Sequence, residues 1–286
     1  MVEMQGGFSF RTKISEIIII FKNIIRCMEI MNGNEIVQEI KVKLAHIEER
    51  ENIRIIYACE SGSRAWGFAS PDSDYDVRFI FVRPFEDYLR IKELPDFIEA
   101  ELNEIYDING WDLKKFFKHL YKSNPVFFEW GNSPIVYRST QKWESIKALM
   151  KDYVLQAAMI HHYCGMAKSN VRSNFSTAEV VLKKYLYVLR PVLACVWIMQ
   201  KHTVPPTEFS KLVEEVLPIE LRTSVDKLLE IKMKSEEKEK GPRITQIDSF
   251  IEVKLNEVTL FPVSNEVQKT YEKLDKLFMN IIQQGA

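Results

Sequence analysis

The segment ESGSRAWGFASPDSDYDVRFIFV, at residues 60–82, decides the fold. The run IRIIYAC just before it, at residues 53–59, is β-branched and aromatic, which predicts a buried strand. Residues 74–82 alternate polar and apolar side chains, which predicts a second strand with Asp74 and Asp76 on one face. We therefore expect a strand, a Gly-Ser loop and another strand.

The loop and the second strand carry groups that suit phosphates and a metal ion. Gly62 lets the backbone approach a ligand closely, and the Ser63 hydroxyl adds a donor for a phosphate oxygen. Asp74 and Asp76, with Cα atoms about 6.5 Å apart, suit a hard octahedral cation such as Mg²⁺. A Gly-Ser pair alone favours a plain turn, and Asp-x-Asp alone favours a solvent-facing edge strand. Together, at this spacing, they indicate a site for a nucleotide and a metal.

A third carboxylate is expected from the stretch DINGWD at residues 107–112. Asp107 lies within the strand predicted there, whereas Asp112 directly precedes a helical segment, where an N-cap residue belongs. We therefore assign Asp107 to catalysis and Asp112 to the cap, and the opposite assignment stays the alternative. Glu60 and Asp72 are interpreted first as loop residues, and a place in the metal region is the alternative for both.

Several cations are candidates to bind phosphate. Arg64 follows the Gly-Ser pair, and Arg78 shares the face of the aspartates, where charge balance is its alternative role. Lys183, Lys184 and Arg190 lie on an otherwise apolar helix. Because a buried cation needs a partner, these residues predict either a phosphate-filled cleft or an internal salt bridge.

The rest of the chain divides into an α/β part and a helical part. Helices are predicted at residues 34–50 and 113–122, a third strand at 104–111 and an extended segment at 134–138. From about residue 150 helix follows helix. The longest is expected at 177–202, starting from the capping box Ser176-x-x-Glu179. The charged run at 232–243 is interpreted as a solvated helix end and loop.

Composition and charge exclude several classes of protein. The net charge is −1 over 286 residues, so no global basic field draws the chain to nucleic acid. The four cysteines contain no C-x-x-C pair, which indicates reduced thiols in a cytoplasmic protein rather than a zinc or redox site. The apolar run at residues 17–21 is far shorter than the about 20 residues of a membrane-spanning helix, so we expect no membrane segment.

The motif Gly-Ser-x(10)-Asp-x-Asp, set between two strands, resembles the DNA polymerase beta-type nucleotidyltransferase superfamily. The strings DINGWDLKKF, NPVFFEW and VLKKYLYVLRPVLACVWI extend the likeness. With them, the chain resembles the nucleotidyltransferases of an RNA repair pathway, the RlaP family, over residues 31–255.

This resemblance implies an enzyme that moves a nucleoside monophosphate from a nucleoside triphosphate to an acceptor, with Mg²⁺ as cofactor and Mn²⁺ as the alternative. It implies that Asp74, Asp76 and Asp107 are the catalytic and metal-binding residues. The nucleotide site would consist of Gly62, Ser63, Arg64, Lys183, Lys184 and Arg190. The implied acceptor is an RNA end; the alternatives are a protein, a tRNA, a small molecule, or a non-catalytic module that binds nucleotides or RNA ends.

The fold class expected from these elements and from the resemblance is α+β. A small mixed β-sheet nucleotidyltransferase core with flanking helices precedes an all-helical C-terminal domain. We expect residues 1–30 to be an N-terminal extension and residues 31–150 to form the catalytic domain. Residues 151–286 would form the helical domain that closes the nucleotide cleft.

Overall fold

The computed structural model of the chain describes residues 34–234, 239–262 and 269–284. Its contacts divide the chain into two compact units, Met1–Arg50 and Glu51–Ala286. The described part of the first unit is helical from residue 34 onward, which confirms the helix predicted at residues 34–50. The expected extension at residues 1–30 lies outside the described residues.

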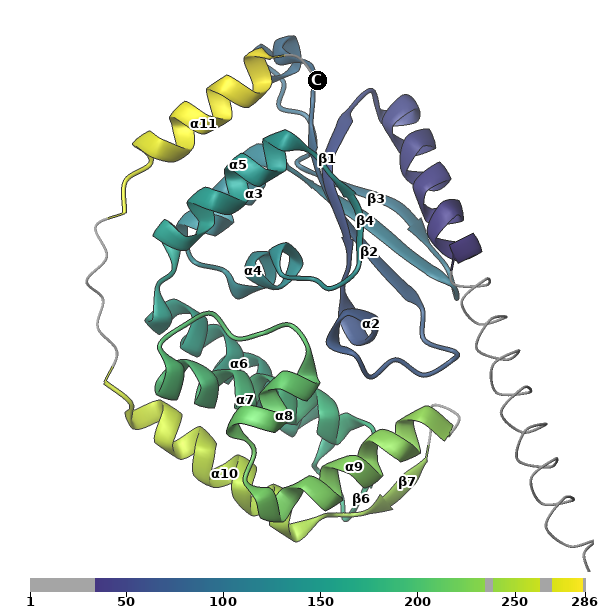
Figure 1. Cartoon of the computed structure of the whole chain (residues 1–286), viewed down its shortest axis with the longest axis vertical. Coiled ribbons are helices and arrows are strands. Elements are labelled where there is room, and N and C mark those ends of the chain that lie inside the picture. The colour runs from purple at the N-terminus through teal and green to yellow at the C-terminus, as the bar shows by residue number, and fades with distance from the viewer. Residues whose placement is uncertain (1–33, 235–238, 263–268, 285–286) are drawn as a thin grey trace, which may run out of the picture. The chain divides into compact units, whose positions relative to one another are not determined.

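The second unit contains a five-stranded sheet in the order β3-β4-β2-β1-β5 (Figure 1). Strands β2 and β4 are parallel and the other neighbours are antiparallel, so the predicted mixed sheet is confirmed. Strand β3 was not predicted: its sequence FIEAEL is short and, as an edge strand, it fully buries a single residue, Ile98. The strands are β1 (Arg54–Glu60), β2 (Tyr75–Val82), β3 (Phe97–Leu102), β4 (Tyr106–Asp112) and β5 (Val136–Ser139).

Short helices connect these strands and cover the sheet. Asp112 caps α3 by accepting a hydrogen bond from the Lys114 amide at 2.7 Å, which confirms the predicted cap. Asn124 and Pro125 follow α3 and start α4, a helix that was not predicted. The elements are α2 (Gly62–Trp66), η1 (Phe85–Leu89), α3 (Leu113–Tyr121), α4 (Pro125–Gly131), α5 (Gln141–Met150) and η2 (Lys151–Tyr153).

The C-terminal half of this unit consists mainly of helices packed around α7, whose side chains are buried on nearly every side. Figure 1 shows α6, α8, α9 and α10 around it. The helices are α6 (Gln156–Asn174), α7 (Lys184–Lys201), α8 (Phe209–Val216), α9 (Ile219–Lys234), α10 (Thr245–Leu260) and α11 (Glu272–Gln283). The division expected near residue 150 remains a prediction, because residues Glu51–Ala286 form one compact unit.

Two details of the helical half differ from the predictions. The capping box at Ser176 and Glu179 is wrong, because Glu179–Val181 forms strand β6 and α7 begins only at Lys184. Strand β6 pairs with β7 (Lys240–Pro242), so the charged run at 232–243 is partly a strand rather than a solvated loop. Pairing of these two short strands satisfies backbone N–H and C=O groups of both segments.

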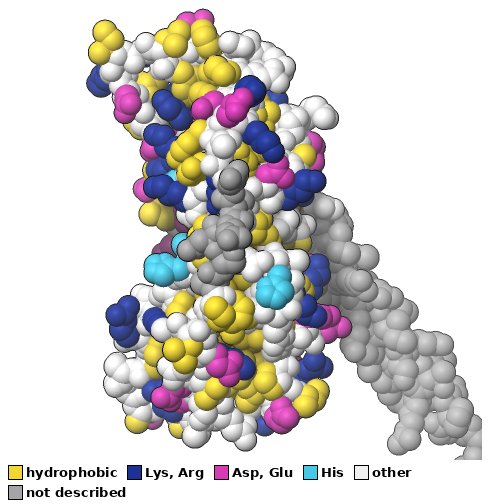
Figure 2. Space-filling view, turned by 90° about the vertical axis from the view of Figure 1, so that its left-hand side faces the viewer, with side chains coloured by type: hydrophobic (Ala, Val, Ile, Leu, Met, Phe, Trp, Pro, Cys, Tyr) yellow, Lys and Arg dark blue, Asp and Glu magenta, His cyan; other side chains and the backbone are white. Residues whose placement is uncertain are grey.

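The described surface carries charges of both signs, and the described cysteines are buried. Lys and Arg side chains are interspersed with Asp and Glu on the face shown in Figure 2. Within the described residues, no helix combines the length and apolar character needed to span a bilayer. Cys59, Cys164 and Cys195 are buried free thiols, and Cys27 lies outside the described residues.

Candidate active site

The Gly-Ser loop lies directly against the first aspartate of β2. Gly62 has a φ of +58°, a conformation that side-chain-bearing residues rarely adopt. The Ser61 amide donates a hydrogen bond to the Asp76 carbonyl oxygen at 2.8 Å. A Cβ atom at Gly62 would lie 1.9 Å from Asp76 Oδ2. Glycine is therefore required here twice, by the backbone conformation and by the contact with Asp76.

Asp76 and Asp107 are neighbours because β2 and β4 are parallel and pair these two residues in register. Arg78 lies two residues after Asp76 on the same face and bridges the two carboxylates. Its Nη2 atom lies 2.7 Å from Asp76 Oδ1 and 2.7 Å from Asp107 Oδ2. A second guanidinium nitrogen, Nη1, donates to the Asp107 carbonyl oxygen at 2.7 Å. Two carboxylates on this face of the sheet therefore bind one guanidinium group.

This arrangement fits the chemistry of a divalent cation. A metal ion at this site would be held by Asp76 and Asp107, each of which has a carboxylate oxygen 2.7 Å from Arg78 Nη2. Within residues 34–234, 239–262 and 269–284, no group of three or more His, Cys, Asp and Glu side chains is arranged to hold a metal ion. The structure thus brings together two of the three predicted carboxylates.

Asp74 lies just before β2 and is exposed. Its negative charge nevertheless acts on Asp76. Burial raises the pKa of Asp76 to about 6; Arg78 opposes this rise, and the charges of Asp74 and Asp107 add to it. Asp74 is therefore close enough to influence the same site, at its solvent side.

Glu60 was interpreted as a loop residue, and the structure corrects this. It is the last residue of β1, it is fully buried, and its Oε1 accepts a hydrogen bond from the Asp76 amide at 2.8 Å. The Tyr137 hydroxyl donates to its other carboxylate oxygen. Burial raises the pKa of Glu60 to about 7, although these two hydrogen bonds lower it. Glu60 therefore fixes the backbone that carries Asp76.

Ser63 and Arg64 shape the loop in the described structure. Ser63 is buried, and its carbonyl oxygen accepts a hydrogen bond from the Phe68 amide at 3.1 Å. Arg64 donates from Nε to the Asp74 carbonyl oxygen at 3.0 Å and lies 3.8 Å from the centre of the Tyr75 ring. The Arg64 side chain therefore ties α2 to the residues that lead into β2.

Lysines of the helical half lie near the loop between α2 and β2. Lys232, on α9, is 4% exposed, and its Nζ lies 3.4 Å from Ser70 Oγ. A hydrogen bond from Ser70 lowers the pKa of Asp72, and the charges of Lys232 and Lys183 lower it further. Lys184 Nζ lies 5.4 Å from the centre of the Tyr187 ring.

Lys232 was missed in the sequence, where it falls in the charged run at 232–243. A signal for it exists, because Leu221, Val225 and Leu228 are the buried residues of α9 and Lys232 continues their spacing. A lysine on the apolar stripe of a helix indicates a specific environment for its charge.

Arg190 lies elsewhere, in the core. It is 2% exposed, and its Nη1 atom lies 3.0 Å from Glu129 Oε1. The Tyr163 hydroxyl donates to the same carboxylate oxygen at 2.7 Å, and Trp66 Nε1 donates to Oε2 at 3.4 Å. This is the internal salt bridge left open as an alternative from the sequence. It links α2, α4, α6 and α7.

Two comparisons with known proteins bear on this site. The model of the family described as "RNA repair pathway DNA polymerase beta family", RlaP, matches residues 36–280. A Bacillus subtilis (strain 168) protein described as "Uncharacterized protein YcgL" is 39% identical over 251 residues, covering 86% of this chain and 96% of that protein.

Proposed function

Since this chain belongs to the RNA repair pathway DNA polymerase beta family, we propose that it transfers a nucleoside monophosphate from a nucleoside triphosphate to a hydroxyl at an RNA end. Family membership implies a polymerase beta-type nucleotidyltransferase, a nucleoside triphosphate substrate and a divalent metal. The observation that supports the proposal most is the convergence of Asp76 and Asp107 on one cationic position beside Gly62.

In this proposal Asp76 and Asp107 hold the metal, with Asp74 at its solvent side. When bound, Mg²⁺ or Mn²⁺ neutralises charge on the nucleotide phosphates and on the departing pyrophosphate. Arg78 must first give up its bonds to the two carboxylates. Because it is only 15% exposed and stays tethered to the Asp107 carbonyl oxygen, it remains at the site to meet a phosphate oxygen.

The reaction itself joins the acceptor oxygen to the α-phosphorus and breaks the bond to pyrophosphate. In this proposal Asp107, on the strand beside Asp76, also accepts the proton of the attacking hydroxyl, and its position next to Asp76 supports this role. Glu60 acts indirectly, through Asp76. It accepts the hydrogen bond of the Asp76 amide and so fixes the direction of the Asp76 carboxylate.

Phosphate binding is assigned to the loop and to the nearby lysines. Gly62 and Ser63 supply backbone N–H groups, and Lys183, Lys184 and Lys232 supply positive charge on the helical side of the loop. The effect of Lys183 and Lys232 on Asp72 supports this placement. Arg190 is left out of the nucleotide site, because its charge is already balanced by Glu129 in the core.

The test is transfer of label from each of the four α-labelled nucleoside triphosphates to RNA ends in the presence of Mg²⁺. The wild-type protein is expected to label RNA and release pyrophosphate. Asp76→Asn and Asp107→Asn are expected to lower the rate at least about 100-fold, because each removes a metal ligand. Asp275→Asn, an exposed change on α11, is the matched control and is expected to have no effect.

The outcomes separate the proposal from its rivals. Label that appears on protein, tRNA or a small molecule in a cell lysate, and not on RNA ends, would assign the same chemistry to another acceptor. Thermal stabilisation by nucleotide without any pyrophosphate release would indicate a binding module. Transfer that survives the two aspartate changes contradicts the proposed site.

A further inference from the structure

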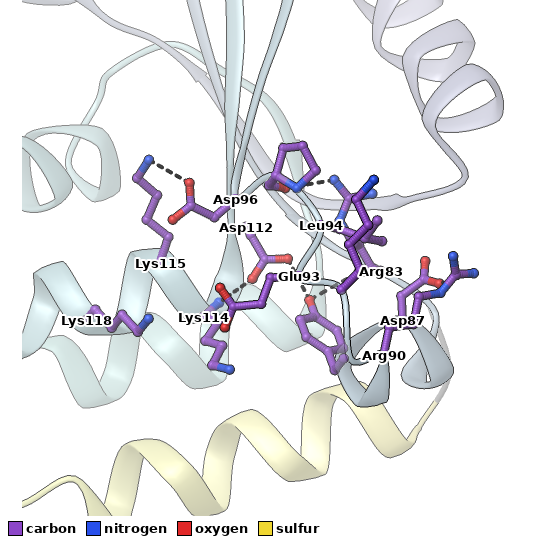
Figure 3. A pocket seen from close by; sticks show the side chains of 13 residues that line it. Arg83, Asp87, Arg90, Glu93, Leu94, Asp96, Asp112, Lys114, Lys115 and Lys118 are labelled. Atoms are coloured by element: carbon purple, nitrogen blue, oxygen red, sulfur yellow. Dashed lines mark hydrogen bonds and ion pairs between the residues drawn. The ribbon is translucent and has the colours of Figure 1, made fainter.

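A cavity of about 620 Å³, lined by many charged side chains, lies away from the aspartate site. Side chains from the first turns of α3 line one part of it, and side chains of η1 and the segment after it line the other (Figure 3). Asp112 lines this cavity and follows Asp107 by five positions on β4, which places the two residues about 17 Å apart along the strand. The cavity and the aspartates therefore lie at opposite ends of β4.

The residues that line the cavity carry more positive than negative charge, in a chain whose net charge is −1. The lining acids are Asp87, Glu93, Asp96 and Asp112, and the lining cations are Arg83, Arg90, Lys92, Lys114, Lys115 and Lys118.

Most of these acids already have partners. Asp87 pairs with Arg90 at 2.8 Å, and Asp96 pairs with Lys115 at 3.0 Å. Asp112 accepts hydrogen bonds from the Lys114 amide and from the Tyr88 hydroxyl. The Asp112 carboxylate is therefore already bound by the start of α3 and by η1.

Three of the lining lysines have no such partner. Within the described part of the chain, Lys92, Lys114 and Lys118 form no ion pair, and Glu93 is the acid left to balance them. Lys114 and Lys118 are four residues apart on α3, so they lie one helical turn from each other and are both exposed.

Arg83 adds a cation held in place by the protein. It is 9% exposed, and its guanidinium donates to the Pro95 carbonyl oxygen at 2.9 Å. It also lies 5.2 Å from the centre of the Phe81 ring. A buried, fixed arginine and two exposed lysines of one helix face line the same cavity and supply positive charge for phosphate oxygens.

We propose that this cavity binds the phosphate backbone of a single-stranded RNA, away from the end that reacts. This inference rests on the proposed function for the identity of the polyanion. The cavity is larger than one phosphate needs and lies in the range of nucleotide-sized sites. At about 3.4 Å per phosphate of a stacked strand, the 17 Å between Asp107 and Asp112 corresponds to about five nucleotides. Contacts here would hold the acceptor without touching the reacting atoms.

The experiment measures binding of a short fluorescein-labelled single-stranded RNA to the full chain by fluorescence anisotropy. It is done with EDTA and without nucleotide, so it does not depend on catalysis. The double variant Lys114→Gln with Lys118→Gln is compared with the control Lys41→Gln with Lys227→Gln, two exposed lysines elsewhere. Far-ultraviolet circular dichroism checks that each variant is folded.

We expect the cavity variant to bind RNA about tenfold more weakly at about 0.1 M salt. The slope of log K against log salt should become shallower by about 1.4, because each lost phosphate contact accounts for about 0.7 on single strands. The control variant should bind as the wild type does.

Three results would overturn the inference. They are an unchanged affinity and slope in the cavity variant, an equal loss in the control, and no RNA binding by the wild-type chain. Failure of the proposed chemistry is recognised separately, by absence of label transfer. RNA binding that depends on Lys114 and Lys118 would persist in Asp76→Asn, because that change lies at the other end of the sheet.

Discussion

Replacing Gly62 with alanine tests whether its contact with Asp76 shapes the site, and Gly67 provides the matched control. Both glycines have positive φ, +58° for Gly62 and +83° for Gly67. A Cβ atom at Gly67 would meet nothing within 4 Å, whereas one at Gly62 would lie 1.9 Å from Asp76 Oδ2 and 2.7 Å from Asp76 Cγ. The pair separates the cost of backbone conformation from the cost of displacing Asp76.

The expected magnitudes follow from these distances. Each substitution loses about 1 kcal/mol of unfolding free energy for placing alanine in the left-handed region. Gly62→Ala must also rotate Asp76 away from Arg78, which breaks a charge-assisted hydrogen bond and costs about 2 kcal/mol more. A carboxylate displaced by about 1 Å is expected to lower the rate of nucleotidyl transfer about 100-fold.

Urea denaturation gives the unfolding free energies, and label transfer per folded molecule gives the rates. Gly67→Ala should be destabilised and fully active, and Gly62→Ala should be less stable still and nearly inactive. Equal transfer rates for the two folded variants would refute the reasoning, because the close approach of Gly62 to Asp76 would then have no role in the reaction.

Three further predictions concern the charges of the protein. Arg78→Ala leaves Asp76 and Asp107 without their shared cation, so we expect a loss of about 2 kcal/mol in unfolding free energy without metal and a larger rise in melting temperature with Mg²⁺ than the wild type shows; equal rises in both proteins would be the contrary result. The pKa of Asp76 is about 6 in the folded chain against 3.8 for the free group, so the folded state keeps a proton that the unfolded state has lost. The free energy of unfolding should therefore fall by at most about 3 kcal/mol as the pH rises from 3.8 to about 6. Urea denaturation at several pH values should show this fall in the wild type. The part of the fall that Asp76 causes should be absent in Asp76→Asn. Glu129→Gln removes the charge partner of Arg190, which is 2% exposed, and is expected to cost about 3 kcal/mol by urea denaturation. The same change at Glu215, whose pair with Lys201 is exposed, should cost far less, and similar costs at the two positions would contradict the assignment of Arg190 to the core.

The elements that were predicted correctly are those whose own sequence decides them. Strands β1, β2 and β4 have apolar or alternating runs, and α3 has a cap and a helical period. The pattern at residues 53–82 therefore predicted strands β1 and β2 and the face of β2 that carries Asp76. Register was not predictable from either strand alone, and it is the parallel pairing of β2 with β4 that places Asp107 beside Asp76.

The features that were missed depend on contacts between distant residues. Strand β6 looked like a helix start because the capping-box pattern is local, whereas its pairing with β7 joins residues about 60 positions apart. Glu60 looked like a loop residue, yet Tyr137 on β5 and the Asp76 amide make it a buried acceptor. The partner of Arg190, Glu129, comes from α4, a helix that was not predicted from the sequence.

The central claim is that Asp76 and Asp107 together hold one divalent cation in place of the Arg78 guanidinium. Titration of Mn²⁺ into the full chain with a non-hydrolysable nucleoside triphosphate analogue, followed by electron paramagnetic resonance, measures this directly. We expect tight Mn²⁺ binding by the wild type, weakened at least about tenfold by Asp76→Asn and by Asp107→Asn separately, because each removes one carboxylate ligand. Unchanged Mn²⁺ affinity in both variants would contradict the claim.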